Sequence, residues 1–202
     1  MGQYYRVAFR HDGKRAVIND LKVEGDGYCM AKLLEHSWLG CHIADAVAEE
    51  MHGNPLRLAW IGDYADDGDE VEVATHGDVN YGRVWKRDHK HTFPRPSDNG
   101  FDYRDKWLVN HDKKLAVSFD EYIAASKTIY GTIAPFPLLA AIGNDRGGGD
   151  YHDGGTDYDK VGTWAWDLIS IEDEKPEGYE EFEVVFKEKE DKEEDEGKKE
   201  VP

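Results

Sequence analysis

The chain has 202 residues, of which 39% are hydrophobic, and a formal net charge of -18; one domain of this size can bury a substantial core. No run of about 18 apolar residues occurs, which argues against a membrane span and a membrane partner. The first residues, MGQYYRVAFRHDG, do not have the pattern of a signal peptide. The two cysteines, Cys29 and Cys41, are too few for a disulfide scaffold or a zinc knuckle, so we expect a reducing, cytoplasmic setting.

Half of the negative charge lies near the C-terminus. Residues 172–202 contain 15 Asp or Glu and 6 Lys or Arg, a balance of -9, and the remaining 28 acids and 19 bases also balance at -9. Both parts would repel phosphates, so we expect no nucleic-acid binding. The acidic surface would instead attract a basic host protein or imitate the charge of DNA. The more common alternative is that the charge only keeps the protein soluble.

In chain order, the first predicted element is a β-hairpin over residues 3–20, because two β-rich runs flank Asp12-Gly13, a favoured two-residue turn. Residues 30–39 and 42–52 have the apolar spacing of helices, and the second ends at Gly53-Asn54-Pro55, a helix terminator.

The next predicted element is a buried strand over residues 56–64, which leaves the core at Gly62-Asp63. A loop rich in Asp and Gly follows over 65–80. Residues 81–86 then predict a strand, and the prolines and polar residues of 91–100 predict a loop.

A second hairpin is predicted over residues 106–119, with the layout of the first. The residues His11, Asp12, Lys14, Ala16 and Val17 recur as His111, Asp112, Lys114, Ala116 and Val117. The repeat is either a duplicated hairpin or, in better agreement with the different strands, a chance repetition of turn chemistry. The hairpin continues into a helix through about Lys127, because Ser118 to Glu121 match a capping box.

Towards the C-terminus, residues 137–143 predict a short apolar helix, and residues 163–171 and 182–186 predict strands. Five tryptophans are expected in the core or on a sheet face because they fall on predicted strands: Trp60, Trp85, Trp107, Trp164 and Trp166.

The order of these elements predicts the fold class. Strands that come as hairpins and are interrupted by two or three helices indicate an α+β fold with a mostly antiparallel sheet. Residues 1–187 are expected to form a single domain, and residues 188–202 have the composition of an acidic disordered tail.

Several phrases resemble a family of uncharacterised bacterial proteins of Firmicutes and their phages or mobile elements. The phrases are MGQYY, LLEHSWLG (33–40), WIGDYADD (60–67), LVNHDKK (108–114) and PLLAAIGNDRGGGDY (137–151). This sequence differs from the family where Asp145 replaces a usual Gly and where Leu115-Ala116 replace an acidic or aromatic pair. The resemblance implies a shared fold and a mobile-element origin, and it implies no activity.

The Gly- and Asp-rich stretch GNDRGGGDYHDGGTDYD (143–159) resembles a ligand loop but matches no phosphate motif. A P-loop needs Lys after its last Gly, where Asp150 stands, and a dinucleotide fingerprint needs Gly where His152 stands. A role in binding an anionic ligand stays open, because Arg146 adjoins glycines whose amides can approach a ligand closely. The ligand-binding candidates here are Asn144, Arg146, Gly147, Gly148 and Gly149.

A divalent cation is a second possible ligand. No EF-hand is complete, because the loop that starts at Asp157 has Val161 fifth and the loop that starts at Asp63 has Ala65 third. An irregular Ca²⁺ or Mg²⁺ site stays open, since hard cations take several oxygen ligands. Its candidate ligands are Asp63, Asp66, Asp67, Asp150 and Asp153. The more common alternative is an ordinary surface loop, in which Gly permits φ > 0 and Asp satisfies turn donors.

Histidine-based sites have weaker support. Glu35-His36 with Cys41 and His42 nearby would suit an acid–base or Cys–His pair, so His36 joins the ligand-binding candidates, although a capped helix end explains it equally well. His89 and His91 have no third ligand at a suggestive spacing.

Two classes of function follow. The first, slightly preferred, is an acidic non-enzymatic binding protein with a basic host protein as partner, such as an accessory protein of a phage or mobile element. The second is a ligand-binding domain or hydrolase that holds metal or phosphate between loops 62–69 and 143–153. Both of these loops contain Gly-Asp-Tyr, at 62–64 and 149–151, so a shared cation requires the two turns to converge.

Overall fold

The structure is a computed structural model that describes residues 4–10, 17–18, 22–23, 32–33, 37–62, 92–93, 100–128, 131–143, 151 and 156–187. Four predicted segments therefore lie outside the described residues: the Asp12-Gly13 turn, the loop over 65–80, the strand at 81–86 with Trp85, and the tail from residue 188.

The described chain contains strands β1 (Tyr5–Arg10), β2 (Val17–Ile18), β3 (Lys22–Val23), β4 (Leu56–Gly62), β5 (Thr92–Phe93), β6 (Trp107–Asn110), β7 (Leu115–Ser118), β8 (Lys127–Thr128), β9 (Gly131–Thr132), β10 (Ala141–Ile142), β11 (Leu168–Glu172) and β12 (Glu180–Glu181). The helices are α1 (His42–Met51), α3 (Phe119–Ala125), α4 (Pro135–Leu139) and the 3-10 helix η2 (Tyr158–Lys160).

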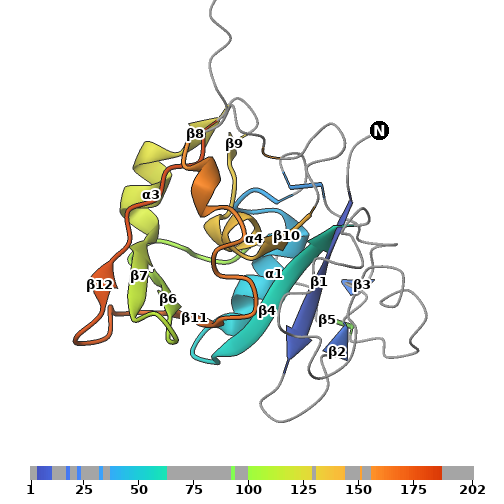
Figure 1. Cartoon of the computed structure of the whole chain (residues 1–202), viewed down its shortest axis with the longest axis horizontal. Helices are drawn as coiled ribbons and strands as arrows, with labels where there is room; N and C mark the ends of the chain where they lie inside the picture. The colour runs from blue at the N-terminus through green and yellow to red at the C-terminus, as the bar shows by residue number, and fades with distance from the viewer. Residues whose placement is uncertain are drawn as a thin grey trace, which may run out of the picture.

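One eight-stranded sheet organises these elements, in the order β12-β7-β6-β11-β4-β1-β2, with β10 paired to β4 off this path (Figure 1). Most pairs are antiparallel, whereas β10 with β4 and β12 with β7 are parallel. Two short pairs, β3–β5 and β8–β9, lie outside this sheet. The fold is thus α+β with a mostly antiparallel sheet, as the sequence predicts.

Both predicted hairpin pairings are present, but their registers differ. Ala8 of β1 lies opposite Ile18, whereas the equivalent Leu108 of β6 lies opposite Val117. A register difference of one residue exchanges the two faces of a strand. The two hairpins therefore do not repeat the same unit, which favours chance repetition of turn chemistry.

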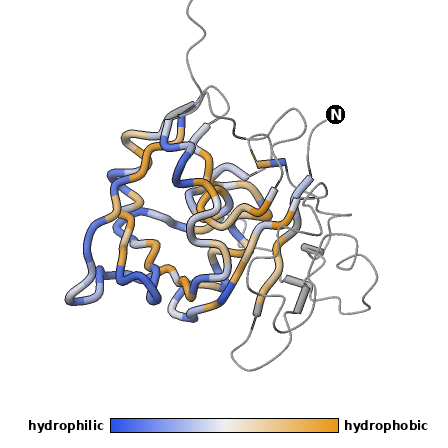
Figure 2. The backbone as a smooth tube through the Cα atoms, in the orientation of Figure 1, coloured by the Kyte–Doolittle hydropathy of each residue, from blue (hydrophilic) through white to orange (hydrophobic). Residues whose placement is uncertain are grey.

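The core forms around the central strand β4. Leu58 and Trp60 of β4 are fully buried, and the Trp60 ring packs against Phe136 of α4 at a centroid distance of 6.0 Å. Helix α1 adds fully buried Val47 and Met51 to the same hydrophobic cluster. In Figure 2 the backbone of β4 and α4 is coloured mostly as hydrophobic, whereas the outer edge at β12 is coloured as hydrophilic.

The helix predictions are partly correct. Helix α1 ends at Met51, before the predicted terminator. The N-cap of α3 is Ser118, whose Oγ accepts from the Glu121 N–H at 3.4 Å. This helix ends at Ala125, two residues before Lys127.

The helix predicted over 30–39 is wrong in its described part. Trp38 forms an isolated β-bridge with Ile133. On either side of it, Leu39 N–H donates to Thr132 O at 2.9 Å and Ser37 O accepts from Ala134 N–H at 2.7 Å. These backbone bonds to a distant segment replace the helical bonds that the apolar spacing predicts, since tertiary context overrides local propensity.

The apolar segment 137–143 also differs from its prediction. Its helix begins earlier, at Pro135, and ends at Leu139, after which Ala141 and Ile142 form β10. Proline at the first helical position explains the early start, because its missing N–H would have no helical partner there.

Three further predictions are corrected. Strand β11 begins only at Leu168, because Trp164 and Trp166 lie in turns, and Trp166 has φ 65°. The stretch 182–186 is not strand, and β12 precedes it. The loop predicted over 91–100 contains β5. Trp164 and Trp166 are nonetheless buried.

Candidate functional site

The two Gly/Asp-rich loops start from neighbouring strand ends. β10 runs parallel to β4, with Ala141 opposite Trp60 and Ile142 opposite Ile61. The next residues are Gly143 and Gly62, the first residues of the two predicted ligand loops. The starting points of the loops therefore converge.

The candidate residues of these loops lie outside the described residues. This applies to Asp63, Asp66, Asp67, Asn144, Arg146, Gly147, Gly148, Gly149, Asp150 and Asp153, and also to His36. Within the ranges that the structure describes, no group of three or more His, Cys, Asp or Glu could hold a metal ion, so the predicted cation site stays a prediction.

The first described residue after the 144–150 stretch is Tyr151, which is buried. Its hydroxyl lies 2.9 Å from Lys187 O and 3.1 Å from Lys187 N. Its ring packs against Phe186 at a centroid distance of 5.3 Å. Tyr151 thus lies in the core beside the C-terminal segment 182–187.

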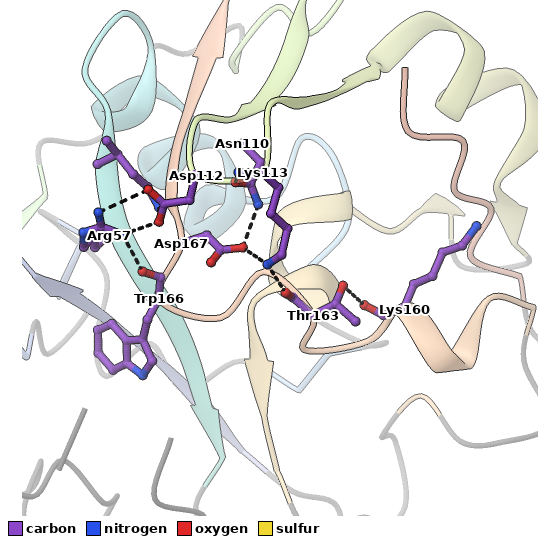
Figure 3. Close-up of polar contacts among 9 residues, drawn as sticks. Arg57, Asn110, Asp112, Lys113, Lys160, Thr163, Trp166 and Asp167 are labelled. Atoms are coloured by element: carbon purple, nitrogen blue, oxygen red, sulfur yellow. Dashed lines mark hydrogen bonds and ion pairs between the residues drawn. The ribbon is translucent and has the colours of Figure 1, made fainter. Parts of the chain in front are cut away.

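Charged residues from three segments meet in the network of Figure 3. Arg57 of β4 binds both carboxylate oxygens of Asp112 at 2.5 and 3.2 Å and donates to Trp166 O at 3.1 Å. Asp112 also accepts from the Leu168 N–H at 3.1 Å. The hydrogen bond from Arg57 is the main reason why the pKa of Asp112 lies below its ordinary value.

The second half of this network joins the β6–β7 turn to the segment before β11. Lys113 Nζ contacts the Asp167 carboxylate and donates to Thr163 O at 2.7 Å. Asn110 Nδ2 donates to the same carboxylate at 2.7 Å. Each charged side chain in the network is therefore paired with one of opposite charge. These pairs hold the β6–β7 turn against β4 and the turn before β11, and they do not leave the charged groups available for a ligand.

A chain of side-chain hydrogen bonds runs through His111. Its Nε2 lies 2.8 Å from Ser170 Oγ, its Nδ1 lies 3.1 Å from the Tyr179 hydroxyl, and Ser170 Oγ lies 2.6 Å from Glu172 Oε1. A catalytic triad would place the carboxylate on the histidine and expose the serine. Here the Glu172 carboxylate accepts a hydrogen bond from Ser170 rather than from His111, and Ser170 is fully buried. The chain is a structural link between β11 and its neighbours.

The buried carboxylate of Asp45 is also structural. It accepts from the Tyr103 hydroxyl at 2.9 Å and from the Gly40 N–H at 3.1 Å. Burial and this carboxylate raise the pKa of Tyr103 well above its ordinary value. Tyr103 therefore stays a hydrogen-bond donor to Asp45, and the pair ties the start of α1 to residues 100–103.

The described basic side chains are largely engaged in ion pairs. These are Arg57–Asp112, Arg104–Asp102, Lys106–Asp173, Lys113–Asp167, Lys160–Asp157 and Lys175–Glu181. In contrast, several exposed carboxylates have no ion-pair partner among the described residues: Asp105, Asp120, Glu121, Asp159, Glu174, Glu177, Glu180 and Glu183. The glutamates Glu121, Glu177, Glu180 and Glu183 lie on α3, on β12 and on the segments beside β12.

A cavity of about 180 Å³ opens beside these glutamates, between β7, α3 and residues 181–185. Its buried lining residues are apolar or aromatic: Ala116, Val117, Tyr122 and Val184. Its exposed lining residues are Glu121, Glu181 and Glu183. The cavity therefore combines an apolar floor with an acidic mouth.

Sequence reasoning did not single out this cavity. From the sequence, Glu121 is predicted only to be part of a capping box, and Glu181 and Glu183 only contribute to the acidic composition of residues 172–202. The pairing of β12 with β7 brings residues 60 positions apart together, as for Glu121 and Glu181, and this pairing depends on backbone bonds such as Phe182 N–H to Ala116 O at 2.8 Å. The one available signal was the accumulation of glutamate in residues 172–187.

No helix in the described ranges is long and apolar enough to cross a membrane. No family model, no curated protein and no solved structure matches this chain.

Proposed function

We propose that the protein is an acidic, non-enzymatic binding protein that recognises a basic partner protein. The observation that carries the proposal is the asymmetry of the surface charges: the described basic side chains are mostly used in ion pairs, and exposed glutamates are left over around β12 and α3. Residues 172–187 hold seven Asp or Glu against two Lys, a balance of -5. A surface of one sign attracts and steers partners of the opposite sign.

The setting of this function follows from the sequence. We place it in the cytoplasm, and we propose an accessory protein of a phage or mobile element that acts on a basic host protein. The phage or mobile-element part of the proposal rests on the family resemblance alone.

Binding of a short oligolysine peptide tests the proposal. We expect its affinity to fall at least about tenfold between 0.01 and 0.15 M salt, where the Debye length shortens from about 30 to about 8 Å. Glu177→Gln/Glu183→Gln should weaken binding more, per charge removed, than the control Glu50→Gln in α1. Equal losses for the two variants would mean that only net charge matters and would contradict recognition at this face.

The acidic tail belongs to the same proposal. Residues 188–202 contain eight Asp or Glu and four Lys, a balance of -4. Deletion of these residues should therefore weaken capture of the oligolysine peptide. Unchanged capture would show that the tail has no role.

A second candidate function is favoured by the pairing of β10 with β4. Because loops 62–69 and 143–153 begin side by side at Gly62 and Gly143, we propose as the alternative a domain or hydrolase that binds a metal or a phosphate ligand between them. Its candidate residues are those named from the sequence, with Asp63 and Asp150 as shared ligands of a divalent cation.

Thermal unfolding with a panel of divalent metals, nucleotides and sugar phosphates tests this alternative. A ligand at about 100 times its Kd stabilises by about 2.7 kcal/mol, which shifts the midpoint by several degrees for a chain of this size. We expect Asp150→Ala to abolish the shift and Asp159→Ala, in η2, to leave it. No shift with any ligand would remove the alternative.

A further inference from the structure

We infer that the cavity between β7, α3 and residues 181–185 receives a lysine side chain of the basic partner. This inference rests on the proposed function and names its point of contact. The three walls come from separate parts of the sequence, and in Figure 1 α3, β7 and β12 lie together on one side of the molecule.

The size and floor of the cavity suit the stem of a lysine. Its volume of about 180 Å³ exceeds the roughly 150 Å³ of a cavity that holds benzene. The buried side chains of Val117, Tyr122 and Val184 line it, and the Tyr122 hydroxyl is already used, because it donates to Ile133 O at 2.8 Å. A floor formed by these apolar and aromatic side chains favours a hydrocarbon chain, and lysine buries its four-carbon stem while its charge stays in water.

The mouth of the cavity suits the ammonium group. Glu181 is already neutralised, since its Oε1 lies 2.5 Å from Lys175 Nζ. Glu121 and Glu183 have no ion-pair partner in the described part of the chain and face the mouth from two different elements. Two carboxylates with no described partner leave a local surplus of negative charge at the opening, which one ammonium group would partly neutralise.

Arginine fits the same place less well. Its planar guanidinium prefers a bidentate carboxylate or the face of an aromatic ring. The partly buried aromatic ring at the cavity is Phe182, and this ring already has Trp164 at a centroid distance of 5.4 Å and Lys160 Nζ at 5.3 Å. The compact charge of lysine needs neither arrangement.

The outer wall of the cavity is held in place without a ligand. Val185 N–H donates to Asp157 Oδ2 at 2.6 Å, and Phe186 N–H donates to Ser126 Oγ at 3.2 Å. Val184 and Phe186 are buried in the core. A site that is already formed loses little conformational entropy when it binds, which favours even a small occupant.

Titration of the full chain with Nα-acetyl-lysine-N-methylamide, followed by amide chemical shifts, tests the inference. We expect saturable shifts in residues 116–125 and 181–185, with at least fivefold weaker binding for the Nε-acetylated probe and for the arginine analogue. Equal binding of the Nε-acetylated probe, or shifts that lie elsewhere, would overturn the inference.

Two variants test the contributions of the apolar floor and of the acidic mouth separately. Ala125 lines the cavity and Ala124 is its exposed neighbour on α3, so Ala125→Leu should abolish binding of the lysine probe and the matched Ala124→Leu should not. Glu121→Gln/Glu183→Gln should weaken binding at least fivefold with an unchanged thermal midpoint. Full binding by Ala125→Leu or by the double glutamine variant would overturn the site.

Failure of this inference can be distinguished from failure of the proposed function. If oligolysine binds the β12 face with strong salt dependence and Ala125→Leu binds it equally well, the acidic face is the recognition surface and the cavity is not. If the lysine probe binds the cavity but oligolysine does not bind, the cavity site is real and the partner is not a basic protein segment.

Discussion

Gly162 lies where the chain passes closest to β10. It has φ 76°, and a Cβ atom there would lie 2.6 Å from Ala141 O, a backbone atom. Gly162→Ala should therefore cost about 3 kcal/mol of unfolding free energy, from the left-handed conformation and the backbone clash together. Gly178→Ala, at φ 80° with open space around it, should cost only about 1 kcal/mol. Urea unfolding measures both, and equal losses would contradict the close approach.

His111 makes the stability depend on pH. Burial lowers its pKa below the ordinary value of 6.5, against the opposing charges of Glu172 and Asp112. Between pH 6.5 and this lower pKa the unfolded chain binds a proton that the folded chain does not, so the folded state loses stability as the pH falls through this window. The described carboxylates with lowered pKa, Asp102, Asp112 and Asp173, affect the stability only at lower pH, below about 3.8.

The measurement is the thermal midpoint of the wild type and of His111→Gln between pH 7.5 and 5. We expect His111→Gln to have a flatter profile over this range, because the neutral amide does not titrate. His42→Gln, at the exposed start of α1, serves as the control and should keep the slope of the wild type. An identical slope for His111→Gln would show that other groups set the pH dependence.

Single residues also show what could be predicted from the sequence. Ser118 was identified as a helix cap because its partner, Glu121, lies three residues away. The partner of Arg57 lies 55 residues away at Asp112, and no local pattern indicates such a pair. For the same reason, no local sequence pattern predicts that Glu121 and Glu183 line one cavity.

At the scale of elements, Tyr151 couples the end of the Gly/Asp-rich loop to the C-terminal segment 182–187. Its hydroxyl contacts both backbone polar atoms of Lys187. Tyr151→Phe should therefore speed amide exchange at Lys187 about fivefold, the equivalent of about 1 kcal/mol for one hydrogen bond. Tyr179→Phe, whose hydroxyl contacts His111 instead, should leave this exchange unchanged. Unaltered exchange in Tyr151→Phe would mean that the bond from the Lys187 N–H to Thr156 Oγ1, at 2.8 Å, protects this amide without the tyrosine hydroxyl.

The elements that were predicted correctly are those with local causes. Helix α1 has its apolar spacing and its terminator within one stretch, and β6 and β7 are joined by a short turn. The helix expected over 30–39 was wrong because residues 37–39 form backbone bonds with 132–134. Trp164 and Trp166 were expected on a strand because they alternate, yet their N–H groups donate to Leu139 O and Leu58 O from turns.

Part of the alternative site was predictable. The repeated Gly-Asp-Tyr indicates two related loops, and the structure adds that their first residues lie side by side, because Gly62 ends β4 and Gly143 follows the parallel strand β10. This adjacency could not be predicted, because β10 was expected to be the end of a helix.

At the scale of the whole molecule, one hydrophobic cluster and one eight-stranded sheet organise most of the described chain, and exposed glutamates without a described ion-pair partner lie on and beside β12, at one edge of that sheet. The interior explains stability, and the proposed recognition of a basic partner is assigned to the edge. The two are separable, because Glu121, Glu177 and Glu183 are exposed and make no ion pair with the described chain. Their neutralisation should alter binding of a basic partner and leave the fold intact.

The most direct test of this account is a map of backbone amide shifts during titration of the full chain with the oligolysine peptide. We predict that the largest shifts fall in residues 116–125 and 177–185 and disappear with added salt. Shifts spread evenly over the surface, or concentrated away from β12 and α3, would contradict the proposed binding face.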